Sequence, residues 1–76
     1  MEYLFTTSLA TDEKNHMYKV FFDNEKYNFL PQEGDENFNG FSFKREHDEW
    51  HDVGTISTQL RKQALQALEE YLLAQH

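Results

Sequence analysis

Cysteine is absent from the chain, and proline and glycine are scarce, with one proline and three glycines among 76 residues. Without cysteine the chain can form neither a disulfide framework nor a thiolate metal site. The scarcity of glycine and proline, together with an aromatic content of 16%, excludes a disordered or low-complexity segment. Aromatic side chains bury large areas and favour strands, so the composition predicts a folded chain with an aromatic core.

Basic residues and long apolar runs are also few. Seven Lys and Arg against 14 Asp and Glu give a net charge of −7, and a field of this sign repels nucleic-acid phosphates. No apolar run approaches the roughly 20 residues of a membrane-spanning helix, and the first residues lack the basic and apolar regions of a signal peptide. We therefore expect a soluble, cytoplasmic protein that binds neither nucleic acid nor a membrane. The acidic charge leaves one alternative open, an inhibitor of a basic partner.

Alternating apolar and polar residues predict an antiparallel sheet. In the first segment, Tyr3 and Phe5 fall on one face and Leu4 on the other. The polar run 11–15 predicts a loop, and Pro31 ends a strand because proline cannot donate to a central ladder. The expected strands are 3–9, 17–22, 27–30, 41–45 and 50–53, with turns at 23–26 and 47–48.

The segment Thr58–Gln75 has the pattern of an amphipathic helix. Apolar residues recur at spacings of three and four, and the Ser57 hydroxyl can cap the first turn. A helix of this length is roughly 27 Å long and covers one face of a sheet. Its apolar positions are Leu60, Ala64, Leu65, Ala67, Leu68, Tyr71 and Leu72. The sequence predicts one small α+β domain over residues 1–76, an antiparallel β-meander of four to five strands with the C-terminal helix on one face.

One loop matches the pattern of a calcium-binding EF-hand. Asp35, Asn37, Asn39, Gly40 and Glu46 fit the twelve-residue spacing, in which hard oxygen ligands alternate around a glycine turn. The flanking segments lack the apolar stripe of the two helices that an EF-hand requires. A polar loop followed by an Asn-Gly turn explains the same residues, so calcium binding by this loop is kept as an alternative.

Two histidines, His47 and His51, have the spacing of a zinc metalloprotease helix. Because this segment is predicted as turn and strand, the two residues would stand about 13 Å apart, too far for one ion. The chain offers neither a nucleophile–base pair nor a glycine-rich phosphate loop. We therefore expect no enzymatic activity, no bound metal and no cofactor.

Apolar residues also occupy the strand positions that alternate with the predicted core. A single helix cannot cover both faces, and a chain of this size has little stability in reserve, so the second face is predicted to bind a protein partner or a second copy. The alternative is a curled sheet that covers both faces itself. The residues assigned to the partner-binding face are Leu4, Met17, Phe21, Leu30 and Trp50.

Overall fold

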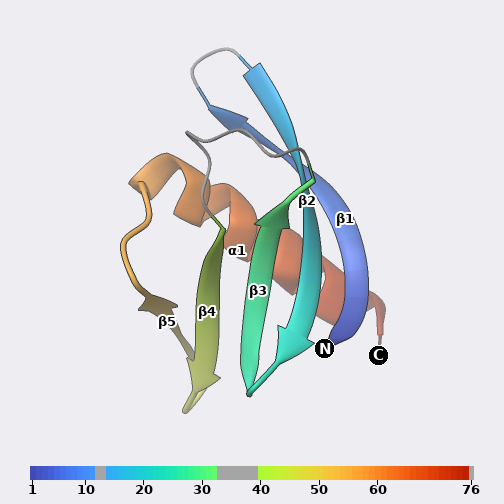
Figure 1. Cartoon of the computed structure of the whole chain (residues 1–76). Coiled ribbons are helices and arrows are strands. Elements are labelled where there is room, and N and C mark those ends of the chain that lie inside the picture. Colours follow the sequence, from blue (N-terminus) through green and yellow to red (C-terminus); the bar gives the residue numbers. More distant parts are fainter. Residues whose placement is uncertain (12–13, 33–39, 76) are drawn as a thin grey trace.

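The computed structural model describes residues 1–11, 14–32 and 40–75. Five antiparallel strands form one sheet in the order β1-β2-β3-β4-β5, and one helix packs against it (Figure 1). The predicted α+β meander with a C-terminal helix is therefore confirmed. The elements are β1 (Glu2–Thr11), β2 (Lys14–Asp23), β3 (Lys26–Pro31), β4 (Phe41–Glu46), β5 (Glu49–Val53) and α1 (Thr58–Ala74).

The first hairpin is longer than the sequence predicts. β1 and β2 have ten residues each, and their pairing runs from Glu2 opposite Phe22 to Thr11 opposite Lys14. The predicted loop 11–15 is therefore wrong at Thr11, Lys14 and Asn15, which belong to the strands. Polar side chains do not prevent pairing here, because the ladder is made by backbone groups and the side chains can remain in water.

The other two hairpins turn through two residues each. Asp23 pairs with Lys26 and Glu46 with Glu49. The residues between them are Asn24, Glu25, His47 and Asp48, all with positive φ between 51° and 64°. A type I′ turn requires positive φ at both central residues, and its twist matches that of the flanking strands. The turns predicted at 23–26 and 47–48 are confirmed.

The core lies between the sheet and α1 and is mainly aromatic. The Phe29 ring stacks on Phe41 at 5.0 Å and meets Phe43 edge-on at 5.9 Å between ring centroids. Gly40 precedes β4 at a close approach, since a Cβ atom there would lie 2.7 Å from the Phe29 carbonyl oxygen. The buried residues are Leu9, Tyr18, Val20, Phe29, Phe41, Phe43, Ala64 and Leu68.

The helix begins where the sequence predicts and is tied to both edge strands. The Leu60 backbone N–H donates to the Ser57 hydroxyl at 3.2 Å, which confirms the predicted N-cap. Arg61 Nε contacts Asp52 Oδ1 of β5 at 2.8 Å. At the other edge, the Tyr71 ring stacks on Phe5 of β1 at 4.7 Å. These contacts hold α1 across one face of the sheet (Figure 1).

A β-bulge changes the faces of β1. The register with β2 shifts between Tyr3 and Phe5, so Leu4 has no single residue opposite it. A bulge inserts one residue and breaks the alternation of side chains. Tyr3 therefore lies on the face away from α1, while Leu4 and Phe5 pack beside the core. The predicted placement of Tyr3 with Phe5, and of Leu4 opposite them, is wrong for this reason.

Candidate functional site

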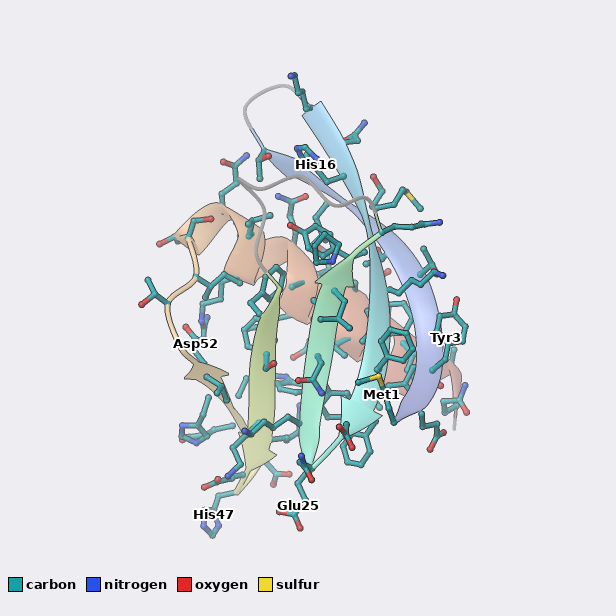
Figure 2. The ribbon with its side chains drawn as sticks, viewed as in Figure 1. Met1, Tyr3, His16, Glu25, His47 and Asp52 are labelled. Carbon is teal, nitrogen blue, oxygen red and sulfur yellow. The ribbon has the colours of Figure 1, made fainter. Side chains whose placement is uncertain are left out.

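The face of the sheet that α1 leaves uncovered, the outer face, is turned toward the reader in Figure 2. Four apolar side chains of β1, β2 and β3 lie on it, and we call them the outer patch: Tyr3, Met17, Phe21 and Leu30. The Tyr3 and Phe21 rings meet edge-on at 5.7 Å. Tyr3, Met17 and Leu30 are exposed to 53%, 46% and 38%, so a large part of each side chain is open to water.

The outer patch surrounds one cation and ends at a polar network. Lys19 is exposed between Thr6 of β1 and Leu30 of β3. Toward β4, the Ser42 hydroxyl donates to Asn28 Oδ1 at 2.6 Å, and Asn28 Nδ2 donates to the Lys26 carbonyl oxygen at 3.2 Å. This network satisfies polar groups at the centre of the outer face and separates the outer patch from Val53, which lies on the same face in β5.

Two residues assigned to the uncovered face by sequence lie on the other face. Leu4 is turned toward α1 by the bulge and packs against the core. Trp50 also packs against the core, with its ring 5.4 Å from that of Tyr27, and the Arg45 guanidinium lies 4.8 Å above the indole. Trp50 pairs with Arg45, and this register, set by the two-residue turn, gives the indole the same face as Phe43. Leu4 and Trp50 therefore do not lie on the uncovered face where they were predicted, whereas Met17, Phe21 and Leu30 do. Partner binding by these residues stays a prediction.

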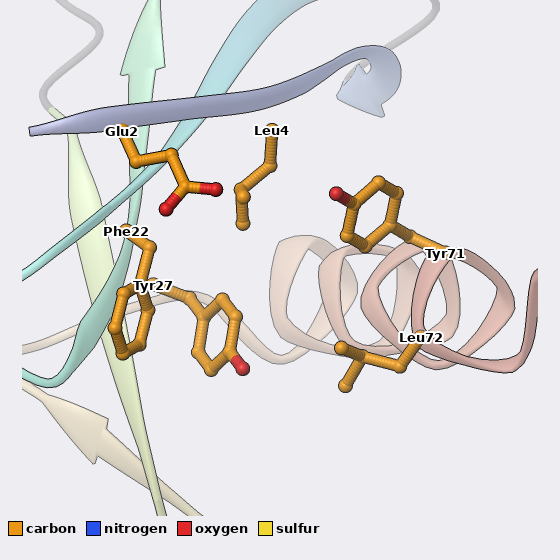
Figure 3. Close-up of a pocket in the computed structure, with 6 residues that line it drawn as sticks. All are labelled: Glu2, Leu4, Phe22, Tyr27, Tyr71 and Leu72. Carbon is orange, nitrogen blue, oxygen red and sulfur yellow. The ribbon is translucent and has the colours of Figure 1, made fainter. Parts of the chain in front are cut away.

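A shallow groove opens between the sheet and the last turns of α1 (Figure 3). Its volume is about 180 Å³. The Glu2 carboxylate points into it, and the remaining lining is aliphatic or aromatic. The lining residues are Glu2, Leu4, Phe22, Tyr27, Tyr71 and Leu72. Sequence reasoning missed this groove because it depends on the bulge, which brings Leu4 to the helix side.

The candidate metal ligands are not brought together in the described residues. Asp35, Asn37 and Asn39 of the calcium-like loop lie outside the described residues, so calcium binding stays a prediction. Glu46 ends β4 and pairs with Lys44 at 3.4 Å. His47 lies in the β4–β5 turn and His51 in β5, where its Nε2 is 3.9 Å from a Glu49 oxygen. Within the described part of the chain, no group of three or more His, Cys, Asp or Glu could hold a metal ion.

The edges of the sheet complete the candidate surfaces. β1 and β5 are the edge strands, and β1 is the longer, with ten residues. Gln63 of α1 reaches the β1 edge, where its side-chain amide donates to the Ala10 carbonyl and accepts from the Ala10 N–H, both at 2.8 Å. Sequence patterning does not reveal such a contact, because a glutamine beside an apolar stripe looks like any other solvated position.

Known proteins offer no guide to these surfaces. No protein-family model matches the chain, and neither a curated protein nor a solved structure matches it significantly. Among the described residues, α1 is too short and too polar to cross a membrane. The chain is therefore described by its α+β fold and by the outer patch, the groove and the β1 edge.

Proposed function

We propose that this chain is a small non-enzymatic interaction module that self-associates through the outer patch. The observation that carries the proposal is the exposure of Tyr3, Met17 and Leu30, which lie around the half-buried Phe21 on the face opposite α1. Large contiguous apolar surfaces are rare on monomeric proteins and mark interaction sites. The polar network at Asn28 and Ser42 separates the patch from Val53 of β5.

A second copy is the occupant that the surface area favours. Folded monomers of this mass expose about 4,900 Å², whereas the chain exposes 5501 Å². A standard interface buries about 800 Å² on each partner. One interface with a second copy would therefore bury more than the difference between the observed and the expected exposed area. Two such sheets would pack face to face at about 10 Å. The aliphatic stem of Lys19 can lie along the patch while its ammonium group reaches water.

The proposal is tested by placing a charge in the outer patch. Leu30→Glu sets a carboxylate on the outer face directly opposite Lys19, so the monomer tolerates it while the dimer must desolvate a new ion pair. We expect the unsubstituted chain to sediment as a dimer, with a Tm that rises with protein concentration. The Leu30→Glu variant should sediment as a monomer with a Tm independent of concentration.

The matched control is Val53→Glu. Val53 lies on the outer face of β5, across Ser42, and its 36% exposure is close to the 38% of Leu30. This variant should remain a dimer, because Val53 is outside the outer patch. The proposal is wrong if the unsubstituted chain is a monomer at high micromolar concentration, or if Val53→Glu dissociates the dimer as fully as Leu30→Glu.

A further inference from the structure

The contact between Gln63 and Ala10 shows which backbone groups of β1 face outward. Both the N–H and the carbonyl of Ala10 bind Gln63 rather than β2. In an antiparallel pair, opposite residues alternate between positions that exchange both hydrogen bonds and positions that exchange none. The register between Phe5 and Ala10 is continuous, so Thr6 and Ser8 face outward like Ala10, and Thr7 and Leu9 bind β2.

The outward groups at Thr6 and Ser8 are open to a further strand. Each residue presents one N–H and one carbonyl, and both residues are exposed. α1 occupies the edge at Ala10 through Gln63, so the open stretch is short and defined. Natural edge strands are protected by lysine, proline or charges that point inward. β1 contains neither lysine nor proline, and its bulge lies before Phe5, outside the open stretch.

The helix side of this edge is acidic. In an α-helix, a residue seven positions along lies on the same side, so Glu70 follows Gln63 along the β1 edge. The Gln66 amide donates to Glu70 at 3.4 Å and holds this carboxylate in place. Glu2 carries a second carboxylate on the same side of β1 and points into the groove (Figure 3). A strand added at this edge would place alternate side chains toward these two carboxylates.

We infer that the β1 edge at Thr6 and Ser8 is a docking site for an extended basic segment of another protein. The segment adds to the sheet beside β1 and exchanges backbone hydrogen bonds with Thr6 and Ser8, as in other β-strand additions. Its lysine or arginine side chains face Glu2 and Glu70, and its alternate small polar side chains lie beside Thr6 and Ser8. Local charge selects this occupant over the β1 edge of a second copy, because β1 itself carries Glu2 and neither lysine nor arginine.

The probe is a blocked heptapeptide of alternating lysine and threonine, titrated into the full chain. Amide hydrogen exchange is followed by NMR at Thr6, Ser8, Thr7 and Leu9. In the free protein, the amides of Thr6 and Ser8 should exchange fast and those of Thr7 and Leu9 slowly. At saturation, exchange at Thr6 and Ser8 should slow at least tenfold, with little change at Thr7 and Leu9. The corresponding glutamate–threonine peptide should give no protection.

Two pairs of variants separate the backbone contact from the charge. Ser8→Pro removes an outward N–H that β2 does not use, so the fold should persist while peptide binding is lost; Ser8→Ala keeps the N–H and should bind normally. Glu70→Gln should weaken binding by about two- to fivefold, the range of exposed ion pairs. Glu69→Gln, on the adjacent helix side that faces water, should not. The comparison of Glu70→Gln with Glu69→Gln tests the role of charge even if Ser8→Pro fails to fold.

Three outcomes would overturn the inference. The first is no protection of Thr6 and Ser8 by the lysine peptide at millimolar concentration. The second is equal binding of the glutamate peptide. The third is protection of both amides in the free protein that increases with protein concentration, which would assign the edge to a second copy. The inference is independent of self-association through the outer patch, because Leu30→Glu leaves the β1 edge unchanged and should still bind the peptide.

Discussion

At the scale of single residues, the hydroxyl of Tyr18 is the most unusual group of the core. The side chain is fully buried, and its hydroxyl has no hydrogen-bond partner in the part of the chain that the structure describes. Burial raises the pKa of Tyr18 above its ordinary value by desolvation of the phenolate. A folded-state pKa above the unfolded one means that the unfolded chain releases this proton first. Stability is therefore present below about pH 10 and is lost as the pH rises toward the folded pKa.

The variant Tyr18→Phe tests this pH dependence. At pH 7 the free energy of unfolding should change by less than about 1 kcal/mol, because the ring contacts remain and no described hydrogen bond is lost. Between pH 9 and 11 the wild-type chain should lose more stability than the variant. Urea unfolding of both proteins at each pH measures the difference, with pH 7 as the reference. A gap that stays constant up to pH 11 would show that burial of this phenol does not affect the alkaline transition.

Single residues also mark where sequence reasoning failed. The alternation of β2 and β4 correctly places Tyr18, Val20, Phe41 and Phe43 in the core. In β1 the same rule assigns Leu4 to the wrong face, because a bulge adds one residue without a glycine or proline to signal it. A period of two has no tolerance for such an insertion. The face of Trp50 was also predicted wrongly, but for a different reason. It depends on the register across the β4–β5 turn rather than on the alternation of apolar residues within β5.

At the scale of elements, the β2–β3 turn contains one side chain that disfavours its backbone. Asn24, His47 and Asp48 are of the types that tolerate positive φ, but Glu25 has a φ of 62°. In the left-handed region, the Cβ of most residues crowds the following carbonyl, which costs roughly 1–2 kcal/mol. Glycine avoids this contact, and Asn-Gly is the preferred pair for a type I′ turn. The β2–β3 turn thus lies one substitution from the favoured sequence.

Glu25→Gly should stabilise the chain by about 1 kcal/mol, because it removes the Cβ contact at a position that already has positive φ. The gain is partly offset by the greater freedom of glycine in the unfolded chain. Thermal unfolding should show a rise in Tm of several degrees. Glu25→Ala is the control, since it removes the charge but keeps the Cβ. An equal gain in both variants would attribute the effect to charge rather than to backbone strain.

The elements themselves could be predicted well. The cap at Ser57, the apolar period of α1 and the turns at 23–26 and 47–48 are local signals, and each appears in the structure. The extension of β1 and β2 to Thr11 and Lys14 could not be predicted, because it depends on pairing between two backbones rather than on either segment. For the same reason, the open edge at Thr6 and Ser8 becomes visible only when the strand order and register are known.

At the scale of the whole molecule, the coverage of one sheet face by one helix was predicted correctly. The choice between a protein partner and a second copy for the other face could not be made from the sequence. The length of α1 and the number of strands already imply an uncovered face. Which side chains lie on it depends on the bulge and on the β4–β5 register. The fit of two such faces in the proposed dimer depends on the shape of the folded surface, which the alternation of residues along one chain does not specify.

The net charge of −7 also acts on the whole molecule. The radius of gyration of the chain is 11.9 Å. This length is shorter than the screening length of about 30 Å at 0.01 M salt but longer than the screening length of roughly 8 Å at 0.15 M. At low salt the excess acids therefore repel one another across the entire chain. Local ion pairs oppose this repulsion. One of them is Arg61–Asp52, whose side chains are 41% and 32% exposed. Exposed pairs contribute at most about 1 kcal/mol each.

Raising NaCl from 0.01 to 0.15 M should therefore raise the Tm by a few degrees, because screening weakens the repulsion more than it weakens these pairs. Differential scanning calorimetry at fixed protein concentration and pH 7 measures the change. The variant Glu69→Lys should show a smaller rise, since it brings the net charge from −7 to −5 at an exposed helix position. The Leu30→Glu variant, measured in parallel, separates this effect from salt-dependent dimerisation. A Tm that falls with added NaCl would mean that the local ion pairs outweigh the excess of acids.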